Sequence, residues 1–341
     1  MSITSNSNAE VDFESIAVES ITNSSETLRL LQANDPCLDA GLIVSMDEND
    51  TNGHDLCEQY FFYPGRLSTK GKEICFGWIS HFLRKCTHLK SFTVTHAPGV
   101  FGTEDAAKLF HGLNENSTIE YVSLDEVRLE VFLPLLAEFA ANKELKGLGI
   151  VSCQWRGDEF EYLRSIIHDC SNIQDLSIGS LSDGEELAAD ELEAMATVTL
   201  NFAQELVSLH RLKRLFIDAM FLNSAACEAL GSFIKKSSTL IRLGLDECYI
   251  GDTKKIAGAV ATNIHIKNLS FHKDGSGHEF AGLGDEGAGH FANAMSANRT
   301  LKVLNLYGNG ITQEDGISSR NHCATLLPFV TRTTRITSFS S

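Results

Sequence analysis

Two groups of residues in this sequence have types and spacings that could support chemistry, and the first is rich in glycine. Gly282, Gly284 and Gly287 match the GxGxxG pattern, in which backbone amides at the start of a helix approach a pyrophosphate group. In a dinucleotide-binding fold this pattern directly follows a strand, whereas a long loop precedes it here. The sequence also has no GxxxxGK[ST] phosphate-binding loop. We interpret the glycines as structural and expect no bound cofactor.

The second group combines histidines with carboxylates in the segment His272–Gly282. The side chains of His272, Asp274, His278 and Glu279 could bind a metal ion in a loop. Their spacing does not hold two ligands on one helical face, as an HExxH motif would. We favour a solvated polar insertion, and we expect no metal.

Nucleophilic catalysis has little support in the sequence. The chain has nine cysteines, an odd number with no CxxC pair, so we expect neither a disulfide framework nor a zinc cluster. There is no GxSxG elbow and no spaced cysteine–histidine signature. We therefore predict that the protein is not an enzyme. The cysteine pattern favours the reducing cytoplasm, with the nucleus as an alternative.

The charge of the chain limits the partners that we expect. Its 341 residues are 43% hydrophobic and 21% charged, with 28 lysines and arginines against 45 acids, and the formal net charge is −17. No stretch of the sequence concentrates lysine and arginine, so we expect no basic face and no nucleic-acid or anionic-membrane partner. No apolar run of about 18 residues or secretion signal occurs, so no membrane span is expected.

An internal repeat predicts the elements that position these residues. A six-residue unit, apolar-x-x-apolar-x-apolar, recurs at intervals of 26 to 39 residues. Its copies begin at Leu89, Ile119, Leu145, Ile173, Leu212, Leu240, Ile266 and Leu301. Between copies, apolar residues recur at three- and four-residue spacing, as on one face of a helix. The pattern predicts an α/β chain in which short strands alternate with helices.

Two other positions of the repeat carry recurring polar residues. Three residues after the unit stand Cys153, Cys248 and Asn309, which we expect to be buried and to hydrogen-bond the backbone where the chain leaves the strand. Three residues before the unit, the sequence has Cys86, Asn116, Asn142, Cys170, Ser237, Asn263 and Asn298. Because asparagine tolerates the left-handed conformation, we expect it to end each helix in that conformation. Asn116 and Asn298 also begin N-x-[ST] sequons, which we expect to be unused.

The segment Gly284–Ala288 and the segment Asn298–Thr312 closely resemble the consensus of leucine-rich repeat proteins of the ribonuclease-inhibitor-like class. The resemblance covers residues 85 to 330 and is strongest at 240–315. It implies a horseshoe-shaped solenoid of about eight to nine repeats, with parallel strands on the concave face and helices on the convex face. Several repeats depart from the consensus after the strand, where Ala97, Val127 or Asp274 replaces asparagine or cysteine.

The ends and insertions depart from the regular repeat. We expect a disordered segment at 1–24 and a solenoid over 25–341, with a degenerate first repeat and insertion at 38–88, clear repeats at 89–330, and an unstructured or partial repeat at 331–341. The expected local elements are a helix near Glu26–Ala33, a strand through Leu38, Gly41 and Ile43, a loop over Asp47–Leu67, a helix over Ser68–Lys85, a helical insert near Ser182–Glu193 and a final helix near Ser319–Val330.

One face of the predicted sheet is the candidate binding surface. The apolar residues of the unit point toward the helices, so the residues between and after them face the other side. The candidate partner-binding residues there are Tyr121, Asp125, Asp175, Arg214, Phe216, Asp218, Arg242, Asp246, His272 and Tyr307. Parallel strands lie about 4.8 Å apart, so these residues form rows.

The centre of this surface allows two interpretations. It combines an aromatic ring, two arginines and two carboxylates: Arg214, Phe216, Asp218, Arg242 and Asp246. Aromatic and arginine side chains often anchor interfaces, which favours a binding site. Alternatively, Arg214 pairs with Asp246 and Arg242 with Asp218 in a solvated ladder that binds nothing.

These observations favour a non-enzymatic scaffold that binds a protein partner through the concave face and adjoining loops. The acidic net charge, together with the resemblance to ribonuclease inhibitor, favours a basic partner. One alternative is a GTPase-activating protein similar to the Ran activator, although that family carries an acidic tail and Thr331–Ser341 has none. Another is the sensor region of a larger immune-type receptor or ligase adaptor. The sequence leaves the oligomeric state open.

The repeat register makes a direct prediction about stability. Leu243→Ala and Leu304→Ala should each lower the free energy of unfolding by about 2–5 kcal/mol, because each leaves a cavity in a close-packed core. Denaturant titration followed by circular dichroism measures this. An unchanged melting curve for either variant would contradict the register.

Overall fold

The computed structural model of the protein describes residues 30–36, 42–45, 65–68, 76–97, 102–155, 158–180, 188–273 and 281–311. The chain forms two compact units, Met1–Ile119 and Glu120–Ser341, called unit 1 and unit 2 below. None of the described helices is both long and apolar enough to cross a membrane.

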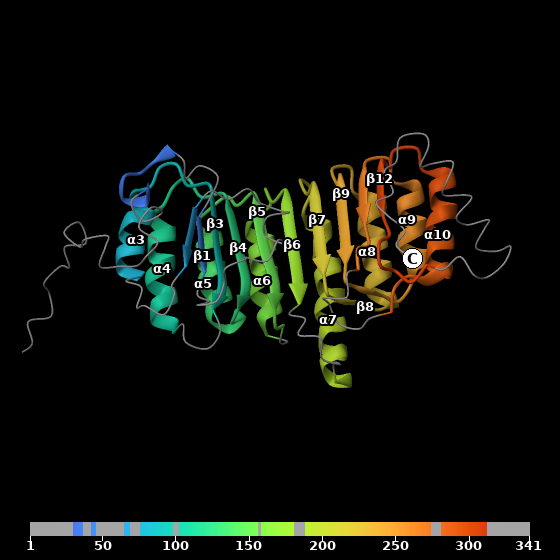
Figure 1. The fold of residues 1–341 in the computed structure, drawn as a ribbon, viewed down its shortest axis with the longest axis horizontal. Coiled ribbons are helices and arrows are strands. Elements are labelled where there is room, and N and C mark those ends of the chain that lie inside the picture. Colours follow the sequence, from blue (N-terminus) through green and yellow to red (C-terminus); the bar gives the residue numbers. More distant parts are fainter. Residues whose placement is uncertain are drawn as a thin grey trace, which may run out of the picture. The chain divides into compact units, whose positions relative to one another are not determined.

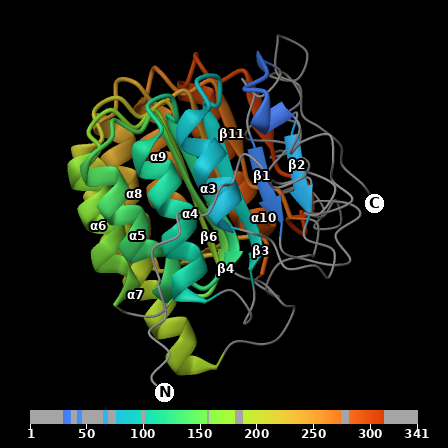
Figure 2. The ribbon, with the colours of Figure 1, turned by 90° about the vertical axis from the view of Figure 1, so that its left-hand side faces the viewer.

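Unit 2 is an α/β structure in which parallel strands alternate with helices, as the repeat predicts (Figure 1). The strands of its main sheet, in spatial order, are β4 (Tyr121–Val127), β5 (Gly147–Cys153), β6 (Asp175–Ser180), β7 (Arg214–Asp218), β9 (Arg242–Asp246), β11 (Asn268–Ser270) and β12 (Val303–Asn305). The helices between them are α5 (Leu129–Ala141), α6 (Glu159–Asp169), α7 (Ala189–Glu205, extended by the 3-10 turn Leu206–Ser208), α8 (Ser224–Lys236), α9 (Thr253–Thr262) and α10 (Gly284–Ala297). Figure 2 shows α5, α6 and α8 on one side of β4 and β6.

A second, two-stranded sheet lies beside the main one. It pairs β8 (Phe221–Leu222) with β10 (Tyr249–Ile250) in parallel. The rings of Phe221 and Tyr249 stack across it, with centroids 4.4 Å apart and planes 5° from parallel. The chain thus makes an extra cross-repeat contact after it leaves β7 and β9.

The core of unit 2 contains a continuous row of aliphatic side chains. The second apolar position of each unit aligns with the same position in the next strand: Val122, Leu148, Leu176, Leu215, Leu243, Leu269 and Leu304. Each is at most 1% exposed. This row confirms the register predicted for these strands, because a shift of one residue would turn the side chains to the opposite face.

The asparagines at the helix ends do not adopt the predicted left-handed conformation. The φ angles of Asn116, Asn263 and Asn298 are −71°, −75° and −74°, in the extended region. The prediction was wrong because it considered only the backbone of these residues. The geometry that these three residues share comes from hydrogen bonds made by the side-chain amide.

Each such amide joins two consecutive repeats. Asn263 Nδ2 donates to the carbonyl oxygens of Ile234 and Ser237 at 2.7 and 3.1 Å, while its Oδ1 accepts from the amides of His265 and Ile266 at 2.8 and 2.9 Å. One side chain therefore satisfies two carbonyl groups at the end of α8 and two amides at the start of the next unit.

The same bridge recurs at other repeats. Asn298 Nδ2 donates to the carbonyl oxygens of Val260 and Asn263 at 2.7 and 2.8 Å. In unit 1, Asn116 makes the equivalent bonds to Leu83 and Cys86, both at 2.7 Å. These bonds form an asparagine ladder that runs from one repeat to the next.

The polar residues after the strand behave as predicted. Cys153, Cys248 and Asn309 are buried. The two thiols lie 3.0 Å from the carbonyl oxygen of Val151 and 3.3 Å from that of Ile217, and Asn309 Nδ2 donates to the carbonyl oxygen of Phe271. Burial raises the pKa of Cys153 and of Cys248, so both thiols stay protonated at neutral pH.

Unit 1 contains β1 (Leu42–Ser45), β2 (Gly65–Ser68), α3 (Phe76–Lys85), β3 (Ser91–Ala97) and α4 (Thr103–Glu115). A strand near the predicted first repeat is present, but its register was wrong by one residue. Leu42 and Val44 align with Phe92 and Val94, the positions that Gly41 and Ile43 were expected to occupy. The alternation of Leu42 and Val44 matches that of β3, whereas the interpretation based on Leu38 does not.

Two other expectations for unit 1 need correction. β2 occupies the end of the predicted loop 47–67 and includes Ser68, the first residue of the predicted helix 68–85, whose described part is α3. β1 pairs with both β2 and β3, so the spatial order is β3, β1, β2. β2 therefore lies at the edge of the sheet and not between β1 and β3, where the order of the sequence would place it. The sequence of β2, GRLS, has no repeat signature that could have predicted this.

The described end of the predicted helical insert 182–193 is helical, while residues 182–187 lie outside those that the structure describes. α7 begins at Ala189, where Glu191 accepts a hydrogen bond from the amide of Ala188 at 2.9 Å, and it continues through Glu205. Residues 30–32 are helical, within the predicted helix 26–33. The predictions for 1–24, 319–330 and 331–341 concern residues outside those that the structure describes.

The asparagine ladder makes a prediction with an internal control. Asn263→Ala should lower the free energy of unfolding by about 2–4 kcal/mol, because it leaves buried carbonyl and amide groups without partners. Asn142→Ala should cost less than about 1 kcal/mol, because Asn142 is exposed and bonds the carbonyl oxygen of Glu138 in its own helix. Equal effects in denaturant titrations would contradict the bridging role.

Candidate functional site

The sheet face of unit 2 that lies away from the helices, called the open face here, carries the candidate binding residues. Along β7, Leu215 and Ile217 are buried, whereas Arg214, Phe216 and Asp218 are partly exposed. The same alternation holds in β11 and β12. The open face is therefore accessible from β7 to β12.

Two of the predicted residues do not fit this description. Asp125 and Asp175 are each only 7% exposed, so they are not available as contact residues on an open surface. Strand alternation gave the correct face for Asp175, but it could not show that neighbouring side chains cover it. Tyr121, on β4, is partly exposed, and burial together with the nearby Asp175 carboxylate raises its pKa.

Arg214 pairs with a different carboxylate from the one expected. Its Nη2 donates to Asp175 Oδ2 at 2.6 Å, and its Nε donates to Asp175 Oδ1. This two-point contact crosses from β7 to β6 and neutralises the buried carboxylate. The alternative ladder based on an Arg214–Asp246 pair was therefore wrong.

The ring of Phe216 lies across the backbone of the next strand. Its register partner on β9 is Gly244, and a Cβ atom at Gly244 would lie 2.6 Å from the Phe216 ring. Tyr121 lies over Gly147 of β5 in the same way. Glycine at position 244 thus leaves room for a partly exposed aromatic ring at the centre of the open face.

Asp246 is held by His272 and by a serine and an asparagine that the sequence analysis did not select. Its Oδ1 accepts hydrogen bonds from Ser270 Oγ at 2.6 Å and from the amide of His272 at 2.7 Å. Asn305 Nδ2 donates to Ser270 Oγ at 3.3 Å. Ser270 and Asn305 occupy the fifth position of their units, next to the aligned leucines, and that position was the signal that could have found them.

The far end of the open face carries a second aromatic group. The rings of His272 and Tyr307 stack with centroids 5.2 Å apart and planes 21° from parallel. Arg242 is exposed, and no carboxylate of the described residues lies within ion-pair distance of its guanidinium group, so the expected Arg242–Asp218 pair does not form. The open-face site consists of seven residues: Arg214, Phe216, Asp218, Arg242, Asp246, His272 and Tyr307.

Hydrogen bonds to Asn309 hold the start of the glycine-rich segment Gly282–Gly287 in place. The amides of Leu283 and Gly284 donate to Asn309 Oδ1 and to the Asn309 carbonyl oxygen at 3.2 and 3.0 Å. A Cβ atom at Gly282 would lie 2.5 Å from the same carbonyl oxygen, and Gly284 has a φ of +60°. Close packing and a left-handed turn therefore account for these two glycines.

The histidine-rich loop lies largely outside the described residues. Of its four candidate ligands the structure describes only His272, which stacks on Tyr307. Within the part of the chain that is described, no group of three or more His, Cys, Asp or Glu side chains could hold a metal ion.

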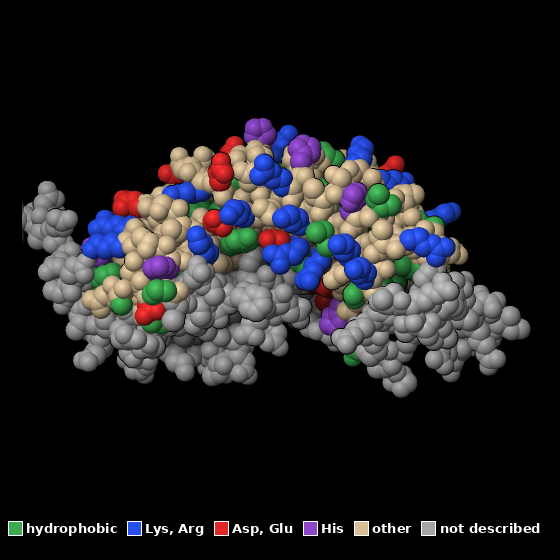
Figure 3. Space-filling view, turned by 90° about the horizontal axis from the view of Figure 1, so that it is seen from above, with side chains coloured by type: hydrophobic (Ala, Val, Ile, Leu, Met, Phe, Trp, Pro, Cys, Tyr) green, Lys and Arg blue, Asp and Glu red, His purple; other side chains and the backbone are tan. Residues whose placement is uncertain are grey.

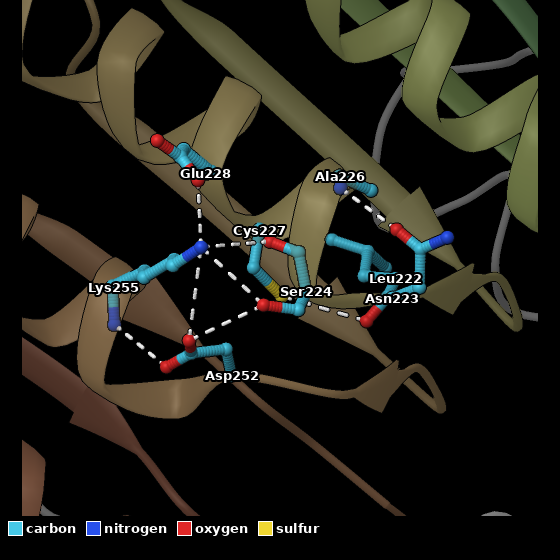
Figure 4. Close-up of polar contacts among 8 residues, drawn as sticks. All are labelled: Leu222, Asn223, Ser224, Ala226, Cys227, Glu228, Asp252 and Lys255. Atoms are coloured by element: carbon cyan, nitrogen blue, oxygen red, sulfur yellow. Dashed lines mark hydrogen bonds and ion pairs between the residues drawn. The ribbon is translucent and has the colours of Figure 1, made fainter.

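A polar cluster at the start of α8 and α9 has the composition of a catalytic pair (Figure 4). Lys255 Nζ lies 3.3 Å from Ser224 Oγ and 2.7 Å from Glu228 Oε2. A lysine can activate a serine only when it is neutral. The hydrogen bond to Glu228 instead raises the pKa of Lys255, which keeps the amine protonated.

The cluster serves to cap and join helices. Asn223 Oδ1 accepts from the amide of Ala226 at 2.9 Å, and Asp252 Oδ1 accepts from the amide of Lys255 at 3.2 Å (Figure 4). Lys255 then reaches back from α9 to Glu228 on α8. The arrangement stabilises two helix N-termini and ties them together.

The Arg214–Asp175 contact can be tested against a matched arginine. Arg214→Ala should lower the free energy of unfolding by about 1–3 kcal/mol at neutral pH, because it leaves the Asp175 carboxylate buried without its cation. Arg242→Ala should have little effect. Denaturant titration of the two variants at neutral pH distinguishes them, and equal losses would contradict this role.

Comparison with known proteins adds little to this geometry. No family model matches the chain, and no curated protein matches it. Among solved structures, the chain is similar to one in the crystal structure of the Rad7 and Elc1 complex in yeast, with 14% sequence identity and a TM-score of 0.38. The match covers 75% of this chain and 73% of that chain. A likeness of this size carries no functional conclusion.

Proposed function

We propose that this chain is a leucine-rich repeat protein of the ribonuclease-inhibitor-like class that serves as a non-enzymatic scaffold and binds a protein partner through the open-face site. The class is supported by the consensus-like segment near Asn298–Thr312, the aligned leucine row and the asparagine ladder. In this class the open face corresponds to the concave side of the solenoid.

The packing of the Phe216 ring against Gly244 is the observation that carries the binding proposal. Its seat on Gly244 fixes the side chain before any partner arrives, so binding costs little side-chain entropy. Arg242 stands beside it without an ion-pair partner among the described residues. A fixed aromatic ring next to an exposed arginine is a common form of interface hot spot.

The carboxylates of the site favour a partner with basic groups near its contact surface. Asp218 and Asp246 follow Phe216 and Gly244 along their strands and align with each other in the sheet. Hydrogen bonds from Ser270 and His272 hold the Asp246 carboxylate in place. The net charge of −17 would speed the approach of a basic protein.

Affinity capture with a matched pair of variants tests the proposal. The site variant carries Phe216→Ala and Arg242→Ala, and it leaves the structural Arg214 in place. The control carries Tyr162→Ala and Lys254→Ala, which also remove one exposed aromatic and one exposed cation, but from helices α6 and α9. Mass spectrometry should find a partner that the native chain and the control retain and the site variant loses by about tenfold or more.

Purified partner and chain then allow the affinity to be measured by calorimetry. A partner that binds the site variant and the native chain equally would refute the open-face site. If the captured partner is a GTPase and the purified chain accelerates its GTP hydrolysis, the result would instead favour the GTPase-activating alternative.

A further inference from the structure

The turns that lead from helix to strand in unit 2 carry a second charged surface, called the basic edge here. Its members are seven exposed cations, which lie at the end of α8 or in the turns just before β7, β11 and β12: Arg211, Lys213, Lys235, Lys236, Lys267, Arg299 and Lys302. Parallel strands all begin at the same edge of a sheet, so these residues gather at one end of the unit. In Figure 1 these strands point downward, and Figure 3, seen from above, looks onto that end.

The basic edge contains no acidic residue. The segments 206–213, 235–241, 262–267 and 297–302 have no aspartate or glutamate, although acids outnumber bases 45 to 28 in the whole chain. No carboxylate of the described residues lies within ion-pair distance of the seven cations. In an earlier repeat, by contrast, Lys146 pairs with Glu120 at 2.7 Å. The prediction that the chain has no basic face was therefore wrong.

Backbone hydrogen bonds place part of the basic edge in a row. The amide of Ile241 donates to the carbonyl oxygen of Lys213 at 2.8 Å, Lys267 donates to Ile241 at 2.8 Å, and Lys302 donates to Lys267 at 2.7 Å. Four consecutive repeats thus present Lys213, Ile241, Lys267 and Lys302 side by side, about 4.8 Å apart. On the right-hand side of Figure 3, which shows this part of unit 2, the charged side chains are mostly those of Lys and Arg.

The helix dipole explains only a small part of this arrangement. Cations favour the last turn of a helix, which accounts for Lys235 and Lys236 at the end of α8. The effect fades beyond the last turn, and Lys213, Lys267 and Lys302 lie past the helix ends, at the start of strands. Binding of a negatively charged ligand would explain why all of these cations lie together.

Aliphatic side chains lie among the cations. Of the large hydrophobic residues that the described chain exposes, three of four stand in the same turns: Val207, Ile241 and Ile264, which are 50%, 36% and 69% exposed. The fourth, Tyr162, is on α6. The basic edge therefore offers apolar contacts together with positive charge.

We propose that the basic edge binds an acidic segment of a partner protein in which apolar residues stand among the carboxylates. The lysines pair with the carboxylates, and Val207, Ile241 and Ile264 contact the apolar side chains. Such a segment matches both the positive charge of the surface and its exposed aliphatic groups. A segment with only carboxylates or only apolar groups would match one of the two.

A nucleic acid fits the basic edge less well. The four segments contain no Phe, Tyr or Trp on which a base could stack. A long polyanion or an anionic membrane would also extend well beyond the edge and meet the field of a chain with net charge −17. A short peptide confined to the edge avoids most of this repulsion, because the Debye length at physiological salt is about 8 Å.

The test compares two double variants with the same change in charge. The edge variant carries Lys267→Glu and Lys302→Glu. The control carries Lys108→Glu and Lys254→Glu, at exposed positions of α4 and α9. The probe is a fluorescent peptide of alternating glutamate and leucine, and its binding is followed by fluorescence anisotropy. None of these substitutions touches the open-face site, so failure of one proposal leaves the other standing.

The native chain and the control should bind the peptide, and the edge variant should bind it about tenfold more weakly or worse. Ile241→Ser with Ile264→Ser should weaken binding of this peptide but not of polyglutamate. Equal binding to the edge and control variants, or none to the native chain, would overturn the proposal. Tighter, edge-dependent binding of duplex DNA or phosphatidylserine vesicles would also overturn it, because it would assign the edge to another class of partner.

Discussion

One constraint governs the structure: the backbone groups at each helix end must find hydrogen-bond partners while consecutive repeats stack directly on one another. Asn263 and Asn298 meet it with a single side-chain amide that bonds carbonyl groups of one repeat and amides of the next. Since each amide bonds equivalent positions of the preceding repeat, these bonds also help to set the register of the neighbouring strands. The leucine row, the open-face site and the basic edge all depend on that register.

The parts of the fold that could be predicted are those written into short stretches of sequence. The alternation of Leu243 and Leu245 defines a buried face without reference to any other repeat. The asparagine before each strand could be located in the same way, but its role could not, because its partners lie in the preceding repeat. β2 escaped prediction for a related reason: its segment has no repeat pattern, and its pairing with β1 depends on the path of the intervening chain.

Side-chain partners across strands were harder to predict than the strands themselves. Alternation assigns Arg214 to the open face but does not say whether it turns toward Asp175 on one side or Asp246 on the other. The buried position of Asp175 decides this, because a carboxylate shielded from water gains most from a cation. The basic edge was missed because each turn contributes only one or two cations. The stacking of the repeats brings these cations together in space, whereas a search along the sequence meets them one turn at a time.

The asparagine ladder also bears on where this chain can fold. Asn116 and Asn298 begin N-x-[ST] sequons, and they are only 1% and 6% exposed. An oligosaccharide would be attached to Nδ2, the atom that donates both carbonyl-directed hydrogen bonds. In a compartment that contains the glycosylating enzyme, modification and folding would compete for the same nitrogen. A chain modified first could not close its repeats at that position, and a chain folded first would no longer be a substrate.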